Sequence, residues 1–223
     1  NMKRYIFIVL FLLSLSGCDI THTGTRPGYI YAYVYFDVPD SKVIYDSETF
    51  TIRLYRKKSL IGTYTDGQDY AFGKSPRKDR YYELCNKFGD INSDGYPCSS
   101  RDVILTPEAS FEIVRHVSIV SDNDWNANLM AGTPLDEIFT IRYFSYFPYI
   151  SNRYTGAPLT SFTKTLSDLK DDEMKLILCN IELNCNSMPT DSHHHTLTVS
   201  FDLDTDRTAT YYVELDFAAP EAQ

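Results

Sequence analysis

Short stretches in which apolar residues alternate with more polar or aromatic ones recur along this chain, and they constrain its fold more than any other feature. The clearest is residues 29–36, where Tyr occupies every second position and Ile30, Ala32, Val34 and Phe36 occupy the positions between. A period of two residues is typical of a β-strand. Further strands are predicted at residues 49–55, 61–65, 103–105, 110–120, 139–149, 196–203 and 208–217. About eight to ten short strands at regular spacing predict an all-β, mainly antiparallel β-sandwich, immunoglobulin-like in general architecture.

Two connections and one helix complete this expected fold. The turn-forming residues Pro39-Asp40-Ser41 predict a hairpin between the strands at 29–36 and 49–55. Residues 68–80 are polar and basic, which is typical of a solvated loop. The best helical candidate is Thr160 to Asp171, so a short helix is expected beside the sandwich.

The N-terminal segment has the pattern of an export signal. Lys3 and Arg4 precede an apolar run from Tyr5 to Leu15, which is shorter than the roughly 20 residues of a membrane-spanning helix. The sequence Leu15-Ser16-Gly17-Cys18 resembles the lipobox of bacterial lipoproteins, in which the chain is cut before the cysteine and the thiol is acylated. The resemblance implies that Cys18 carries acyl chains such as palmitate, and more than one chain holds a protein durably on a bilayer. A chance cysteine at the end of an ordinary signal peptide is the alternative.

These observations predict four segments: a lipoprotein signal peptide at 1–17, a lipid-anchored tether at 18–28, a single β-sandwich domain at 29–217 and a C-terminal tail at 218–223. The formal net charge is −9, and it becomes more negative when Lys3 and Arg4 leave with the signal peptide. Because nucleic acids and anionic lipid headgroups bind basic surfaces, this charge argues against both as partners.

Four cysteines remain besides the lipidated one, an even number in an exported chain. Disulfide bonds are therefore expected, and three pairings are possible. The spacing favours Cys85 with Cys98 and Cys179 with Cys185, each closing a short polar loop, so a disulfide-closed loop insertion is part of the predicted fold. A zinc site is disfavoured because no C-x-x-C pair is present.

One motif has the spacing of a cation site. Asp90, Asn92 and Asp94 follow the pattern D-x-N-x-D-G, similar to the first half of EF-hand-like loops, with the Tyr96 carbonyl as a fourth ligand. The twelfth position holds Arg101 where such loops have a bidentate Glu. The sequence therefore predicts a possible Ca²⁺ site, and the alternative is an Asx turn without a metal.

The most aromatic segment, residues 139–149, offers a second candidate site. Tyr143, Tyr146 and Tyr149 are candidate ligand-binding residues, and Tyr154 is expected near the same rim. An exposed cluster of this kind marks a binding surface. Packing in the core is the alternative, because a sandwich of this size needs many buried rings.

The chain contains no catalytic motif. G-x-S-x-G and H-E-x-x-H are both absent, and cysteines that form disulfides are not nucleophiles. Three adjacent histidines at 193–195 project to alternating sides of an extended chain, so at most two of them can face one metal. A pair of carboxylates for glycoside hydrolysis is not recognisable from sequence, so a carbohydrate-active enzyme remains a weaker alternative.

Residues 117–139, VSIVSDNDWNANLMAGTPLDEIF, resemble a stretch of uncharacterised lipoproteins of Bacteroidetes. In those lipoproteins an apolar strand is followed by a polar turn, an aromatic residue, an Ala-Gly pair, and then Leu-Asp or Leu-Asn before Phe. The lipobox and the chain length agree with this resemblance, which implies a membrane-anchored envelope lipoprotein. In the lipoproteins that it resembles, export to the cell surface is associated with an acidic cluster just after the lipidated cysteine, whereas here Asp19 stands alone. The resemblance therefore implies the outer membrane, with the domain facing the periplasm.

The function expected from these features is a non-catalytic binding or assembly module for a glycan or an envelope protein. A purely structural envelope protein is the alternative.

Overall fold

The computed structural model describes residues 25–46, 49–56, 70–71, 78–92, 96–97 and 107–217. The predicted signal peptide with Cys18, the strands predicted at 61–65 and 103–105, and the residues Asp94, Cys98 and Arg101 lie outside this part of the chain.

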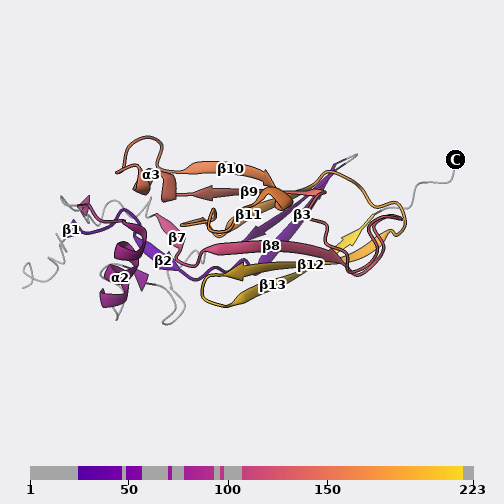
Figure 1. Cartoon of the computed structure of the whole chain (residues 1–223), viewed down its shortest axis with the longest axis horizontal. Helices are drawn as coiled ribbons and strands as arrows, with labels where there is room; N and C mark the ends of the chain where they lie inside the picture. Colours follow the sequence, from indigo (N-terminus) through magenta and orange to yellow (C-terminus); the bar gives the residue numbers. More distant parts are fainter. Residues whose placement is uncertain are drawn as a thin grey trace, which may run out of the picture.

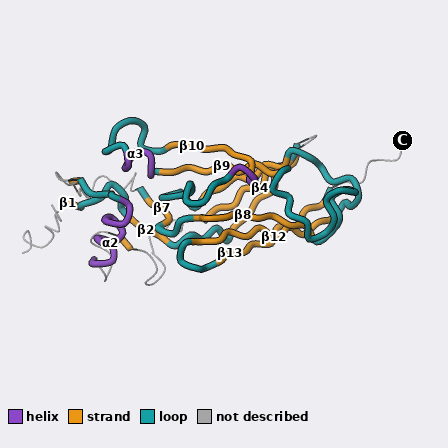
Figure 2. The backbone as a smooth tube through the Cα atoms, viewed as in Figure 1, coloured by secondary structure: helices purple, strands orange, loops and turns teal. Residues whose placement is uncertain are grey.

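Two antiparallel sheets form a β-sandwich (Figures 1 and 2). The larger sheet has the strand order β10-β9-β11-β4-β3, with bounds β3 Asp40–Tyr45, β4 Phe50–Tyr55, β9 Phe139–Ser145, β10 Thr160–Thr165 and β11 Asn180–Cys185. The smaller sheet has the order β13-β12-β8, with bounds β8 Val114–Ser121, β12 His194–Leu203 and β13 Thr208–Asp216. Every neighbouring pair in both sheets is antiparallel, which confirms the predicted fold class.

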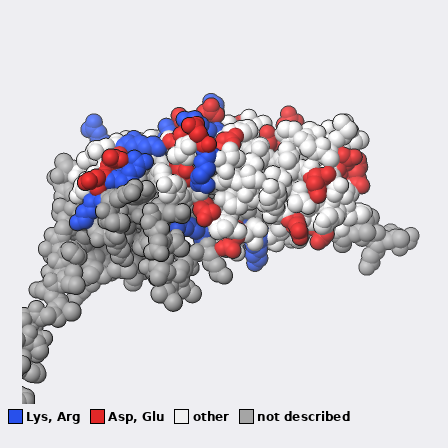
Figure 3. Space-filling view, turned by 90° about the horizontal axis from the view of Figure 1, so that it is seen from below, with Lys and Arg blue, Asp and Glu red and all other residues white. Residues whose placement is uncertain are grey.

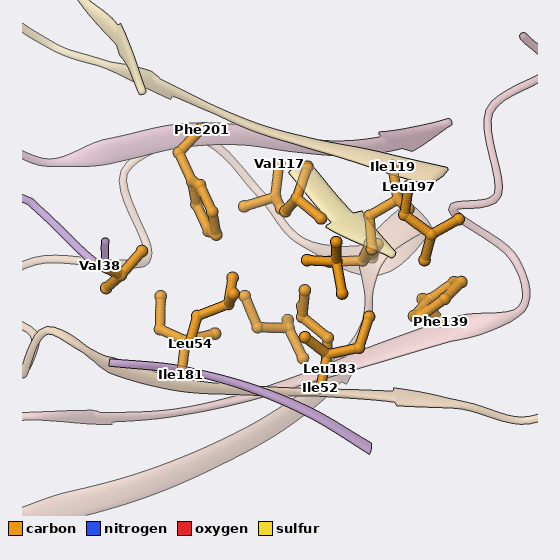
Figure 4. Packing of buried hydrophobic residues seen from close by; sticks show 14 of the residues in the cluster. Val38, Ile52, Leu54, Val117, Ile119, Phe139, Ile181, Leu183, Leu197 and Phe201 are labelled. Atoms are coloured by element: carbon orange, nitrogen blue, oxygen red, sulfur yellow. The ribbon is translucent and has the colours of Figure 1, made fainter. Parts of the chain in front are cut away.

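Alternating side chains from the two sheets fill the space between them. Phe201, Leu197, Val117 and Ile119 come from the smaller sheet, and they face Ile52, Leu54, Ile181 and Leu183 from the larger one (Figure 4). All eight side chains are almost completely buried. Because burial of apolar area is the main favourable term in folding, this layer provides most of the stability of the sandwich.

Strand β11 lies at the centre of the larger sheet and joins its two halves. On one side Leu183 pairs with Ile52 of β4, and on the other side it pairs with Ile141 of β9. The N-terminal hairpin β3-β4 therefore enters the sheet through a strand more than 100 residues later in the chain.

The predicted hairpin is wrong in its first strand. Pro39-Asp40-Ser41 is not a turn, because β3 begins at Asp40 and itself pairs with β4. Of residues 29–36, only Ala32–Val34 form a strand, β2. All three of its residues are buried, since β2 pairs in parallel with β7 (Glu108–Ser110) and antiparallel with β5 (Tyr70–Ala71). Burial on both faces is typical of a strand with a parallel neighbour.

A second apolar core lies at the end of the sandwich away from the C-terminus (Figure 1). It packs β2 and β7 against helix α2 (Lys78–Phe88) and helix α3 (Phe147–Ser151). Helix α2 buries Tyr81, Leu84, Cys85 and Phe88, and this spacing places all four on one helical face. Gly89, with φ of 67°, follows the last turn, as left-handed glycines commonly do.

The predicted helix at Thr160 to Asp171 is wrong. The segment forms β10 and then one 3₁₀ turn, η2 (Leu166–Asp168). Three of the six residues of β10 are Thr, and its Phe162 pairs with Tyr143 of β9, so cross-strand packing decides the structure. The helix instead begins inside the stretch predicted as a solvated loop.

The predicted disulfides are not supported by the structure, in which Cys85, Cys179 and Cys185 are free thiols. Cys179 directly precedes the extended strand β11 and Cys185 is its last residue, so the two lie about 20 Å apart at the rise of a strand, whereas a disulfide needs α-carbons within about 7 Å. Cys85 lies on the buried face of α2.

The last residues of the predicted tether already belong to the folded domain. Thr25–Arg26 form β1, which pairs with β6 (Tyr96–Pro97), and Asn92 donates a backbone hydrogen bond to the Pro27 carbonyl. In the part of the chain that the structure describes, no helix is long and apolar enough to cross a bilayer.

Candidate functional site

The structure buries Asp90 completely, just after helix α2. Its Oδ1 accepts hydrogen bonds from the Tyr29 N–H at 2.7 Å and the Tyr154 hydroxyl at 3.2 Å. Its Oδ2 accepts from the Ile30 N–H at 3.0 Å and the Tyr33 hydroxyl at 2.8 Å. These four donors offset the cost of removing a carboxylate from water, and they tie the start of the domain to α2 and to the loop after α3.

This geometry assigns Asp90 a different role from the one the calcium motif predicts. Both carboxylate oxygens point at protein donors, so neither is free to face a cation. Among the described residues there is also no cluster of three or more His, Cys, Asp or Glu side chains that could hold a metal. A role for Asp94 in cation binding stays a prediction.

Cys85 lies beside this carboxylate, with its Sγ 3.8 Å from the Tyr33 hydroxyl. Burial, reinforced by the charge of Asp90, raises the pKa of the Cys85 thiol to about 11. The same two causes raise the pKa of Tyr33. Both groups stay protonated at neutral pH, so neither can act as a nucleophile or a general base there.

Three of the four rim tyrosines lie together beside Asp90. The ring of Tyr29 lies 5.0 Å from that of Tyr149 and 5.9 Å from that of Tyr146, and Tyr149 lies 5.7 Å from Tyr154. Tyr143 is elsewhere, because it faces the main core from β9. Two of these ring contacts are edge to face and the third is tilted, and Tyr29, Tyr146 and Tyr154 pack against the second core, where they are partly buried.

One serine–histidine pair has the spacing of a catalytic dyad. The Ser121 Oγ lies 2.8 Å from the His195 Nδ1. Both residues are buried, the His195 Nε2 lies 3.1 Å from the Ser192 carbonyl, and the ring packs 4.8 Å from that of Trp125. A substrate cannot reach this pair, which instead fastens the start of β12 to β8.

A different surface has the properties of a binding site, namely the outer face of the β13-β12-β8 sheet. Pairing across these strands gives two adjacent rows, Val120–Thr198–Tyr212 and Ser118–Ser200–Thr210. We call the five hydroxyl-bearing residues of these rows the hydroxyl face: Ser118, Thr198, Ser200, Thr210 and Tyr212. None of them carries a charge.

Tyr212 is the most exposed large hydrophobic side chain on this sheet. It is 71% exposed, whereas the neighbouring Tyr211 turns inward and packs on Phe201. Each row beyond the hydroxyl face contains a carboxylate, since Glu214 pairs with Thr196, and Asp202 lies between Thr208 and His116. Seen from the side of β12 and β13, the middle of the molecule is largely uncharged, and carboxylates gather toward the C-terminal end (Figure 3).

This arrangement offers three kinds of contact on one flat surface. The hydroxyl groups both donate and accept hydrogen bonds, and the tyrosine ring offers an apolar plane. Three strands about 4.8 Å apart make the face about 10 Å wide. A ligand with flat C–H surfaces and many hydroxyl groups, such as a short glycan, matches these contacts.

Sequence reasoning predicted the strands at 196–203 and 208–217 but did not single out Tyr212. The signal was the alternation of Thr196, Thr198 and Ser200 with apolar residues, repeated by Thr208 and Thr210. Only the pairing of the strands shows that these residues lie side by side on one surface.

The chain matches no protein family model, no curated protein and no solved structure.

Proposed function

We propose that this protein is a bacterial envelope lipoprotein, anchored through acyl chains on Cys18, whose β-sandwich binds a neutral glycan through the hydroxyl face. The lipobox-like sequence and the resemblance to Bacteroidetes lipoproteins support the anchor. The outer membrane is the proposed location, with the domain facing the periplasm.

The observation that carries the glycan proposal is the exposed ring of Tyr212 at the β13 end of an uncharged cross-strand row, next to the row of Ser118, Ser200 and Thr210. A ring in water gains free energy when an apolar surface covers it, and the C–H face of a sugar provides such a surface. Protein interfaces are instead centred on several packed apolar or aromatic anchors, and this face has one. None of the five residues of the face is a cation that could pair with an anionic sugar.

The same face argues against cleavage of the bound glycan. Glycoside hydrolysis by two carboxylates requires them within about 10 Å of each other. Asp202 and Glu214 lie in cross-strand rows six residues apart along β13, which is about 20 Å at the rise of a strand. They can flank a ligand but not act together on one bond.

Binding of neutral oligosaccharides to the full chain, by glycan array and then calorimetry, tests the proposal. Tyr212→Ala should weaken binding about tenfold, because loss of one aromatic contact costs about 1.4 kcal/mol. Tyr82→Ala is the matched control, since Tyr82 is 42% exposed but lies on α2. Absence of binding, or equal affinity of both variants, would overturn the proposal and favour the purely structural alternative.

The anchor has its own test. Cells that express the protein should incorporate a fatty-acid analogue into it, and Cys18→Ala should remove both the label and the membrane association. Labelling that persists in the variant would refute the lipidation of Cys18.

A further inference from the structure

The edges of the two sheets are protected unequally. The outer edge of β8 is covered, because the Gly132 N–H donates to the Ser121 carbonyl and the Leu135 N–H donates to the Ile119 carbonyl, both at 2.8 Å. The edge strands β3 and β10 have six residues each, and they carry Lys42 and Lys164. Short length and lysine are the usual means of discouraging an edge strand from pairing with another chain.

Strand β13 has none of these protections. It runs for nine residues, TATYYVELD, without Lys, Pro or Gly. Just beyond it, the Phe217 N–H donates to His193 on the β12 side, whereas the Asp216 N–H donates to the Tyr45 hydroxyl on the other side. Since successive residues of a strand point to opposite edges, the backbone groups of Thr210, Tyr212 and Glu214 point away from β12. No described residue pairs with these three N–H groups.

We propose that β13 pairs antiparallel with β13 of a second copy of this chain, about a two-fold axis at Tyr212. Tyr212 is the midpoint of Thr208–Asp216, so this register aligns the two strands end to end while the Asp216 N–H stays bound to Tyr45 of its own chain. The outward backbone groups of Thr210, Tyr212 and Glu214 then form about six hydrogen bonds with the second copy. The two smaller sheets become one continuous sheet.

Side chains in this register are complementary. Thr210 lies opposite Glu214 of the second copy, and Thr208 lies opposite Asp216, so no two carboxylates face each other directly. The two Tyr212 rings become cross-strand neighbours, an arrangement that stabilises antiparallel pairs. A shift of the axis to Glu214 would bring two glutamates together, which disfavours that alternative.

The pairing goes beyond the proposed glycan function, and it is tested without a glycan. Both outer faces of a continuous sheet point the same way, so the dimer places two hydroxyl faces side by side. The dimer itself is formed by the outward backbone groups of β13.

Sedimentation equilibrium of the full chain in detergent micelles should show a monomer–dimer equilibrium. Thr210→Glu should weaken the dimer about fivefold, because the two-fold axis creates two glutamate pairs across the interface. Addition of Glu214→Lys to that variant should restore association, since opposite charges then face each other. Thr163→Glu, at an exposed threonine of β10, is the matched control and should change nothing.

Circular dichroism and melting temperature establish that each variant is folded. A wild-type monomer at all concentrations would refute the pairing, as would a dimer unaffected by Thr210→Glu. A double variant that remains as weak as Thr210→Glu would refute the register. Loss of glycan binding by Tyr212→Ala with unchanged dimerisation supports the glycan proposal alone. Glycan binding and pairing of β13 are therefore tested by separate measurements.

Discussion

Replacement of Asp90 by Asn tests whether one buried carboxylate holds the α2 end of the domain together. The two side chains have nearly the same shape, so packing is preserved. One oxygen, however, becomes an amide nitrogen, which donates hydrogen bonds and cannot accept them. Whichever way the amide turns, two of the four donors around Asp90 lose their acceptor.

The expected loss of stability follows from these contacts. A hydrogen bond to a charged group contributes about 1.5–3 kcal/mol, so two lost bonds amount to about 3–6 kcal/mol. Removal of the buried charge also recovers part of its desolvation cost. We therefore expect the free energy of unfolding to fall by about 3 kcal/mol. In a domain of this size the melting temperature should fall by roughly 6–12 °C.

Thermal unfolding and amide hydrogen exchange measure the effect. Exchange at Tyr29 and Ile30 should accelerate more than exchange in β12, because their N–H groups bind Asp90 directly. Asp168→Asn is the matched control, since this exposed side chain makes no hydrogen bond in the described part of the chain. Tyr33→Phe removes a single donor and should cost about half as much.

A variant that melts within about 1 °C of wild type would refute this account of Asp90. A second outcome would revive the calcium motif: wild type melting higher in calcium than in chelator, with the difference lost in Asp90→Asn. The hydrogen bonds described above predict no such difference.

Three further results are expected. Gly28→Ala should lower the free energy of unfolding by about 1–3 kcal/mol, because an added Cβ would lie 2.5 Å from the Asp90 Oδ2 and 2.8 Å from the Cys85 Sγ. Equal melting temperatures of Gly28→Ala and wild type would contradict this expectation. Cys85 and Cys185 should resist alkylation in the folded protein and react on unfolding without reductant, as mass spectrometry can show, because burial raises their pKa values to about 11 and about 12. Above about pH 9 the unfolded thiols ionise while the folded ones stay protonated, so melting temperature should fall steadily toward pH 11, and a flat profile would count against the buried thiols.

Local pattern predicted much of the sandwich correctly. The alternation at residues 196–203 and 208–217 corresponds to β12 and β13 with little shift, whereas the strand predicted at 110–120 begins only at Val114, as β8. In these strands one face packs on the core and the other faces water, so apolar and polar residues alternate in the sequence with a period of two. The same is true of Phe50, Ile52 and Leu54 on β4.

The wrong predictions concern segments in which buried and exposed residues do not simply alternate along the chain. Residues 29–36 alternate as written, yet Tyr33 is as buried as its neighbours because its hydroxyl reaches Asp90. Helix α2 is polar around most of its circumference, so only four buried residues reveal it. The disulfide prediction assumed that cysteines close in sequence are close in space, which an extended strand such as β11 prevents.

The site was harder to predict than the fold. Asp90 and Tyr154 are 64 residues apart, and nothing local indicates that they meet. Thr198 and Tyr212 become neighbours only through the pairing of β12 with β13. A surface assembled from outward positions of three strands has no motif of its own.

The central position of β11 also bears on how the chain can be made. The ribosome synthesises β3 and β4 long before Asn180–Cys185. Until β11 is made, Ile52 and Leu54 lack their neighbours Leu183 and Ile181, so the edge of β4 that pairs with β11 stays uncovered. Contacts of such long sequence separation form slowly, and partly folded chains with bare strand edges associate with one another. The yield of folded protein should therefore depend on the rate of synthesis and on holding chaperones. This dependence should be stronger than for a β-sandwich whose neighbouring strands are consecutive in the chain.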